Sequence, residues 1–266
     1  MTPGVDAAPL YPGAKDYYLL TDELDEPDRL REAVLITARA LPEPRPKGAR
    51  CETSMLCLIF DLDGTLVDSE PLATQAFLDL LPQLDDTVPG LMRRYTGLQF
   101  AQVVADLSAR LGHSLPDDFE VSYRRRIAQL YDTSLAPMPG AVEMLSALQN
   151  PRCVASNGPV SKMTHGLRVT GLAGFFGDKL FSAYQVGQWK PEPHLFLHAA
   201  RAMNVPPEMC LVIEDSDAGL QAAKAAGMRA VQFSPTPVRK SDLAYAQVFD
   251  LRELANVLQG APVCGL

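Results

Sequence analysis

Long hydrophobic runs are absent from the 266-residue sequence. No stretch approaches the roughly 20 consecutive apolar residues that a membrane-spanning helix needs. The first residues also lack the basic cluster and apolar core of a signal peptide, and acidic residues come early, at Asp6 and Asp16. We therefore expect a cytoplasmic protein without a membrane among its partners.

Cysteine is scarce and shows no pattern. The sequence has five cysteines, with no C-x-x-C pair and no Cys/His cluster of the kind that binds zinc. Cys57, Cys153 and Cys210 lie in or beside apolar, strand-like segments, where a reduced thiol serves as a small core residue. This usage is typical of a reducing compartment.

Clustered positive charge is missing as well. The net charge is −8, and nucleic acids are bound by grouped basic side chains, so we expect no nucleic acid partner. The one basic run, Arg124–Arg126, falls in a helix-like stretch and is interpreted as a solvated helix face. The length suits one large domain, or one domain with an insertion.

Residues 1–54 differ from the rest of the chain. Prolines and glycines interrupt their start, and residues 41–48 read as an extended, proline-rich linker. Between these segments, Leu30, Val34, Ala38 and Leu41 recur at helical spacing. We predict an N-terminal extension over 1–54, with one helix and a linker, which need not belong to the core fold. Met55 precedes the first convincing strand and is an alternative start.

From residue 56 the pattern becomes α/β. Short apolar runs predict buried parallel strands at Leu56–Phe60, Arg152–Ala155, Cys210–Ile213 and Arg229–Phe233. Helical patterns cover Pro139–Gln149, Pro193–Met203 and Ala218–Ala226, the last capped by Gly227. We predict a Rossmann-like, three-layer α/β core over 55–68 and 136–258, an all-helical insertion over 69–135, and a tail over 259–266.

Reactive side chains stand where the first three strands end, at Asp61, Ser156 and Glu214. Ligands of open parallel sheets bind beyond the carboxyl ends of the strands, so these ends should converge on one crevice. The strongest signal is Phe60-Asp61-Leu62-Asp63-Gly64-Thr65-Leu66. Two carboxylates this close repel each other, and a divalent cation offsets that repulsion. Asp61 would then attack phosphorus, and Asp63 would serve as general acid and base.

This motif and three later ones give residues 56–258 a resemblance to the haloacid dehalogenase (HAD) superfamily of phosphatases. Ser156-Asn157 resembles the second motif, which binds phosphate, and Lys190 resembles the third, whose ammonium neutralises phosphoryl charge. Glu214-Asp215 resembles the acidic fourth motif. The resemblance implies a phosphatase with an aspartyl-phosphate intermediate on Asp61. It also implies Mg²⁺ held by Asp61, the backbone carbonyl of Asp63, Asp215 and Glu214, the last directly or through water.

The resemblance also suggests a substrate class. The helical insertion is similar to a small cap that closes over the crevice in one HAD subclass. The stretch from Ser156 to Val205 resembles bacterial HAD phosphatases that act on 6-phosphogluconate, so a phosphorylated sugar or sugar acid is expected. A cap loop is expected at Gly97–Gln99, and a substrate carboxylate would need Arg93, Arg94 or another nearby cation. Lys162 and His165 could reach the mouth of the site, but we interpret them as helix-surface residues.

Alternatives remain open. A β-phosphoglucomutase-type phosphotransferase shares the chemistry, but such mutases carry a hinge histidine where this chain has Ala73, and a cap-loop arginine that is missing here. The dehalogenase branch lacks the second aspartate that Asp63 supplies. A non-catalytic sugar-phosphate-binding module would be expected to have lost Asp61, Asp63, Lys190 or Asp215, and all are present. The protein is expected to be a monomer or homodimer.

Overall fold

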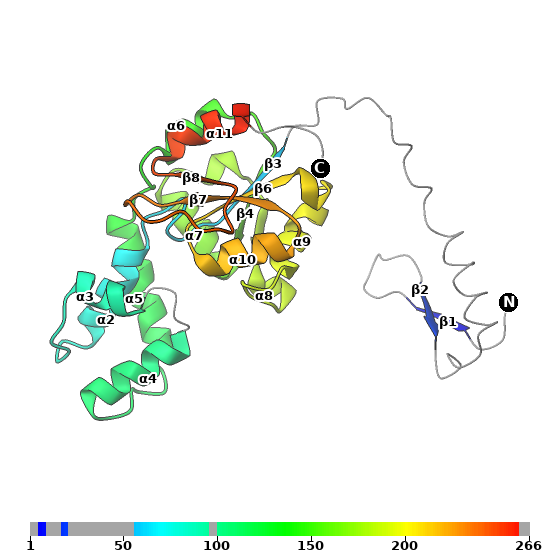
Figure 1. The fold of residues 1–266 in the computed structure, drawn as a ribbon. Coiled ribbons are helices and arrows are strands. Elements are labelled where there is room, and N and C mark those ends of the chain that lie inside the picture. Colours follow the sequence, from blue (N-terminus) through cyan, green and yellow to red (C-terminus); the bar gives the residue numbers. More distant parts are fainter. Residues whose placement is uncertain (1–4, 9–16, 21–55, 96–99, 261–266) are drawn as a thin grey trace, which may run out of the picture. The chain divides into compact units, whose positions relative to one another are not determined.

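The computed structural model describes residues 5–8, 17–20, 56–95 and 100–260 (Figure 1). The chain divides into two compact units, Met1–Cys51 and Glu52–Leu266. In the first unit, β1 (Val5–Ala8) and β2 (Tyr17–Leu20) pair as antiparallel strands, which the sequence analysis did not predict. The helix predicted over Leu30–Leu41, the linker that follows and the cap loop Gly97–Gln99 lie outside the described residues.

A parallel sheet forms the centre of the second unit, with the strand order β5-β4-β3-β6-β7-β8. The strands are β3 (Cys57–Phe60), β4 (Arg152–Ser156), β5 (Leu180–Ser182), β6 (Cys210–Glu214), β7 (Arg229–Phe233) and β8 (Ala246–Val248). The four predicted strands are confirmed as β3, β4, β6 and β7. The short strands β5 and β8, which extend the sheet at its two ends, were not predicted.

Helices cover both faces of this sheet, because successive strand side chains point to opposite sides (Figure 1). Leu58 and Phe60 pack with α6 (Ala141–Ala147), α7 (Val160–Val169) and α11 (Leu254–Gly260). Cys57 and Ile59 pack on the other face with α9 (His194–Ala202) and α10 (Asp217–Ala225). The predicted three-layer α/β fold is therefore confirmed. Helix α8 (Ala183–Val186) is a short link after β5.

The described cysteines lie within one of these layers. Cys57, Cys153 and Cys210 are buried and unbridged, and they pack among the side chains of α9 and α10. Register places Cys57 opposite Cys210, and Cys153 opposite Ile59. Their predicted role as small core residues is confirmed.

Between β3 and α6 the described chain is helical, without a strand in residues 70–95 and 100–134. The helices are α2 (Glu70–Leu80), α3 (Val88–Tyr95), α4 (Phe100–Leu111) and α5 (Phe119–Ser134). They enclose a small core of their own in which Phe77 and Tyr123 stack with ring centroids 4.3 Å apart. This helical lobe corresponds to the predicted cap, and its boundaries stay our proposal.

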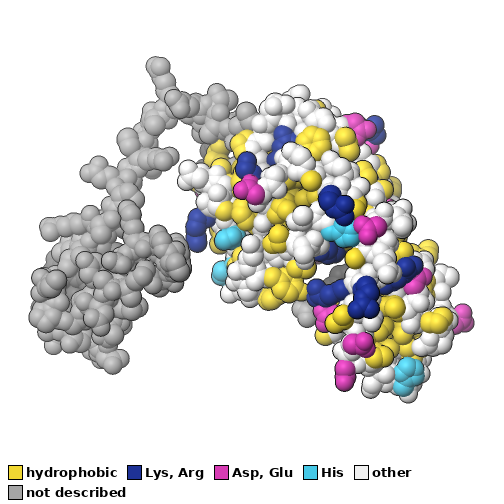
Figure 2. All heavy atoms as spheres, turned by 180° about the vertical axis from the view of Figure 1, so that it is seen from behind, with side chains coloured by type: hydrophobic (Ala, Val, Ile, Leu, Met, Phe, Trp, Pro, Cys, Tyr) yellow, Lys and Arg dark blue, Asp and Glu magenta, His cyan; other side chains and the backbone are white. Residues whose placement is uncertain are grey.

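The surface shows mixed charge. On the face seen in Figure 2, basic side chains are interspersed with acidic ones. Arg124 pairs with Glu120, and Arg126 pairs with Asp79, which agrees with a solvated helix face. Within the described ranges, no helix has the length and apolarity needed to cross a membrane.

Candidate active site

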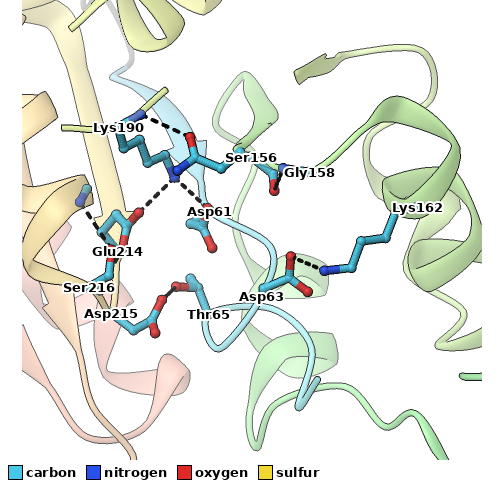
Figure 3. A network of polar contacts seen from close by, with 12 residues as sticks. Asp61, Asp63, Thr65, Ser156, Gly158, Lys162, Lys190, Glu214, Asp215 and Ser216 are labelled. Atoms are coloured by element: carbon cyan, nitrogen blue, oxygen red, sulfur yellow. Dashed lines mark hydrogen bonds and ion pairs between the residues drawn. The ribbon is translucent and has the colours of Figure 1, made fainter. Parts of the chain in front are cut away.

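The first motif follows β3 directly. Asp61 is 7% exposed, and its backbone N–H donates to the Ile213 carbonyl of β6 at 3.0 Å, which continues the sheet contact past the strand end. Asp63 lies in the turn that follows (Figure 3). Both carboxylates line one large cavity beyond the carboxyl ends of the strands, as the sequence analysis expected.

Gly64 lets the first and fourth motifs approach closely. Its φ of +80° favours glycine, and a Cβ at this position would lie 2.4 Å from Asp215 Oδ2. The Thr65 hydroxyl donates to Asp215 Oδ1 at 2.8 Å. Asp215 is therefore fixed beside the Asp61–Thr65 turn.

Lys190 joins the third motif to both acidic motifs. Its Nζ lies 2.5 Å from Asp61 Oδ1 and 2.7 Å from Glu214 Oε1, and its side chain is 3% exposed (Figure 3). The backbone N–H of Lys190 donates to Asn157 Oδ1 at 3.0 Å. Burial opposes the charge, but Asp61 and Glu214 keep the pKa of Lys190 above its ordinary value. Lys190 therefore stays an ammonium aimed at Asp61.

Ser156 and Asn157 lie at the end of β4. The Ser156 hydroxyl accepts from the backbone N–H of Gly158 at 3.0 Å, and the Gly158 carbonyl accepts from the Ser182 hydroxyl at 2.7 Å. Ser156, Asn157 and Gly158 line the same cavity as Asp61. The loop thus presents a hydroxyl toward the first motif, while the Asn157 side chain holds Lys190.

Glu214 is enclosed by protein donors. Besides Lys190 on Oε1, its Oε2 accepts from the backbone N–H of Ser216 at 2.7 Å and from the Ser216 hydroxyl at 2.9 Å. Ser216 also caps α10 by accepting from the N–H of Gly219. A Cβ at Gly219 would lie 1.8 Å from Glu214 Oε1, so the first turn of α10 packs directly on this carboxylate.

The site holds more buried carboxylates than ammonium groups around Asp61. Asp61 and Glu214 share the Lys190 ammonium, and Asp215 has no ion pair of its own among those found in the described residues. Burial, opposed by Lys190, raises the pKa of Asp61 to about 7. Burial, then Glu214 and Asp61, also raise the pKa of Asp215 well above its ordinary value. A further cation would relieve this excess negative charge.

The donor types suit a hard divalent cation. Asp61 and Asp215 offer carboxylate oxygens, which Mg²⁺ prefers together with water and phosphate oxygens. Within the described residues, no three His, Cys, Asp or Glu side chains already form a metal-binding group. The expected site adds Glu214 and the backbone carbonyl of Asp63 to these two carboxylates, and such an all-oxygen donor set fits the ion.

Asp63 is held by three donors from separate parts of the fold. Its Oδ1 accepts from the Ser69 hydroxyl at 2.6 Å and from the Tyr131 hydroxyl of α5 at 3.3 Å. Its Oδ2 accepts from Lys162 Nζ of α7 at 2.8 Å. Burial opposes ionisation, but Lys162, Ser69 and Tyr131 together lower the pKa of Asp63. Our interpretation of Lys162 as a helix-surface residue is therefore wrong, since its ammonium binds Asp63.

The other candidate cations do not surround Asp61. Arg93 and Arg94 line a separate hollow with Asp86 and Gly90. His165 Nε2 lies 2.7 Å from Asp132 Oδ1, on the side of α7 that contacts α5. The cavity of about 1420 Å³ that contains Asp61 is lined by Lys162, Lys190, Trp189 and, from the loop after β7, residues 238–242.

Sequence reasoning missed several contributors to this site. Thr65, Ser69 and Tyr131 carry ordinary hydroxyls whose role depends on their neighbours in space. One signal was available for Lys162, because it falls in the first turn of the helix after Ser156, and that end of the helix faces the crevice. Residues 238–242 gave no signal of their own, and only Pro235 and Pro237, just before them, marked a loop.

Comparisons with known proteins agree with this geometry. Residues 55–227 match the haloacid dehalogenase-like hydrolase family. The chain is 38% identical to Escherichia coli K12 6-phosphogluconate phosphatase over 186 residues, which cover 69% of this chain and 84% of that protein. It is 32% identical to hexitol phosphatase B of the same strain over 211 residues, which cover 75% and 94%.

A solved structure extends the comparison. A HAD family hydrolase from Deinococcus radiodurans R1, with bound phosphate and sodium, has a TM-score of 0.66 and 29% identity, covering 78% of this chain and 96% of that one. The family match alone spans well over half of the sequence and confirms the resemblance and the hydrolase class that the motifs predicted. The chain therefore belongs to the haloacid dehalogenase-like hydrolase family.

Proposed function

We propose that this hydrolase removes phosphate from a small phosphorylated sugar or sugar acid, with 6-phosphogluconate as the preferred candidate, in a Mg²⁺-dependent reaction. The observation that carries the proposal is the convergence of Asp61, Asp63, Lys190 and Asp215 on one cavity that Ser156 also lines. The names of the relatives, a 6-phosphogluconate phosphatase and a hexitol phosphatase, support the substrate class.

Asp61 is the proposed nucleophile. One of its oxygens attacks phosphorus, the bond from phosphorus to the sugar oxygen breaks, and an aspartyl phosphate forms. Lys190, already 2.5 Å from Asp61 Oδ1, offsets phosphoryl charge in this step. The Ser156 hydroxyl and the backbone N–H groups near Asn157 orient the phosphoryl oxygens.

Asp63 is the proposed general acid and base. It protonates the departing sugar oxygen and then takes a proton from the water that hydrolyses the aspartyl phosphate. To reach these atoms, its carboxyl must exchange at least part of its contacts with Ser69, Tyr131 and Lys162. Because Tyr131 belongs to α5 of the helical lobe, proton transfer is coupled to the position of that lobe.

Mg²⁺ would be held by Asp61, Asp215 and the Asp63 backbone carbonyl, and when bound it would offset the charge of these carboxylates and the phosphate. The sequence analysis also assigned Glu214 to the metal. Its two oxygens accept from Lys190 and Ser216, so we propose that Glu214 chiefly positions Lys190.

The test is phosphate release from phosphorylated sugars and sugar acids with and without Mg²⁺, using Asp61→Asn as the matched control. We expect Mg²⁺-dependent release from 6-phosphogluconate, and none from Asp61→Asn, because an amide cannot form the acyl phosphate. Conversion of β-glucose 1-phosphate to the 6-phosphate without phosphate release would replace the phosphatase by a mutase. Binding without any turnover would favour a non-catalytic module.

A further inference from the structure

A phosphorylated sugar acid carries negative charge at two ends, so its recognition requires a second cationic site away from the phosphoryl group. The basic side chains that line the cavity are Lys162, Lys190, Arg239 and Lys240. Lys190 is bound to Asp61 and Glu214, and Lys162 is bound to Asp63. The remaining two belong to the loop between β7 and β8.

This loop, residues 234–245, leaves the carboxyl end of β7 at the same edge of the sheet as Asp61. Hydrogen bonds fix it at several points. The Gln232 side chain accepts from the Ser241 N–H at 2.7 Å, and the Gln247 side chain donates to the Val238 carbonyl at 3.1 Å. Residues 238–242 line the cavity, so the loop forms one wall of the space that holds Asp61.

The two basic side chains of the loop differ in their contacts. Lys240 Nζ donates to the Ala244 carbonyl at 2.7 Å and so serves the loop itself. Arg239 has an ion pair with Asp242 at 3.6 Å, and the two side chains are 87% and 90% exposed. An ion pair this exposed is weak, so the Arg239 guanidinium can exchange it for a ligand at little cost.

We propose that Arg239 binds the carboxylate of the substrate at the end remote from the phosphoryl group, and that the loop after β7 thereby selects sugar acids over neutral sugars. This inference rests on the proposed function. A guanidinium binds a carboxylate through two parallel N–H···O bonds, which suits a planar anion better than an ammonium does. Asp242 limits this selection, because it competes with the ligand for Arg239.

The test compares two substrates that differ only in the proposed contact: 6-phosphogluconate and glucitol 6-phosphate, in which a CH₂OH group replaces the carboxylate. In Arg239→Gln, we expect KM for 6-phosphogluconate to rise about tenfold, equivalent to about 1.4 kcal/mol, with kcat unchanged. KM for glucitol 6-phosphate should not change. Lys240→Gln is the matched control, since it removes a neighbouring charge from the same loop and should leave the ratio of the two KM values unchanged.

Asp242→Asn should lower KM for 6-phosphogluconate, whereas Arg239→Gln raises it. Without the competing Asp242 carboxylate, Arg239 should bind the substrate carboxylate more tightly. KM for glucitol 6-phosphate should stay constant. Equal changes for both substrates in Arg239→Gln, no change at all, or the same loss of selectivity in Lys240→Gln would overturn the assignment.

A binding measurement separates this inference from the proposed function. Trp189 is the single tryptophan of the chain and lines the cavity, so its fluorescence can report binding to the inactive Asp61→Asn variant. If the wild-type protein releases no phosphate, the proposed function fails. Even then, Arg239 would be supported as the carboxylate-binding residue if 6-phosphogluconate binds more tightly than glucitol 6-phosphate and Arg239→Gln abolishes this difference. If the two ligands bind equally well before that substitution, the assignment of Arg239 is overturned.

Discussion

Lys162 Nζ lies 2.8 Å from Asp63 Oδ2, which ties the helix after the second motif to the proposed acid and base of the first. The side chain of Lys162 also passes Gly158, where an added Cβ would be in ordinary van der Waals contact, 3.4 Å from its Cδ. The ammonium therefore reaches Asp63 alongside the loop that follows Ser156.

Lys162→Met should shift the acidic limb of the pH–kcat profile to higher pH. Lys162 lowers the pKa of Asp63 against the effect of burial, so its removal raises that pKa, and the ionised base is lost at a higher pH. At pH 6 we expect kcat to fall about tenfold, less than the ~10²–10⁴-fold contribution of general acid–base catalysis. Lys224→Met, on the exposed side of α10, is the control. An unchanged profile would contradict the role.

Gly219→Ala should reduce both stability and activity. The new Cβ would lie 1.8 Å from Glu214 Oε1, so Glu214 must move away from Lys190 or α10 must shift. Such overpacking costs about 1–3 kcal/mol of unfolding free energy. Thermal unfolding and phosphate release measure the two effects. Gly174→Ala, whose Cβ meets nothing within 4 Å, should resemble the wild type. If Gly219→Ala has the wild-type unfolding temperature and the wild-type rate of phosphate release, then α10 shifts to accept the new Cβ without cost, which would contradict the prediction.

Mg²⁺ should stabilise the protein more at pH 8 than at pH 5.5. Burial raises the pKa of Asp61 to about 7, and the pKa of Asp215 is also raised. Their folded-state pKa values exceed the unfolded ones, so the metal-free fold loses stability as pH rises through this window. With Mg²⁺ about 100-fold above its Kd at pH 8, we expect Tm to rise by about 5–10 °C.

Asp215→Asn is the control for this effect. It removes one buried carboxylate, so the metal-free variant should have a higher Tm than the wild type at pH 8 and should respond weakly to Mg²⁺. A Tm shift of the same size at both pH values, or a full response in Asp215→Asn, would argue against these carboxylates as the metal site.

A chain that begins at Met55 should keep phosphatase activity. Every residue of the candidate site lies in the unit Glu52–Leu266, which is compact by itself. Turnover of 6-phosphogluconate by the shortened and full-length proteins is the measurement. An insoluble or inactive short protein would show that residues 1–54 contribute to folding.

The parts of the fold that could be predicted are those with a strong local signal. The run Leu56–Phe60 is apolar throughout because β3 is buried on both faces, and Asp61 ends it abruptly. Strands β5 and β8 have three residues each, too few to show a periodic pattern, and they pair with β4 and β7. Their existence is decided by tertiary contacts.

The same distinction applies to the candidate site. Asp61, Ser156 and Glu214 are marked in sequence because each stands where an apolar run ends, and the parallel sheet brings strand ends together. The roles of Lys162 and Arg239 depend instead on the direction of α7 and on the path of the loop after β7. For Lys162 the only local signal is its place in the first turn of α7, and a lysine on a helix usually faces solvent.

The buried thiols can report how often the core of this protein opens locally. Cys57, Cys153 and Cys210 are 0% exposed and belong to β3, β4 and β6. An alkylating reagent reaches them only when the sheet and the α9–α10 layer separate. Asp61, Ser156 and Glu214 stand at the carboxyl ends of these same three strands. The alkylation rate at each thiol, measured by peptide mass spectrometry, would therefore report how often the strands that carry the catalytic groups become exposed. A bound ligand that stabilises the site would slow this alkylation.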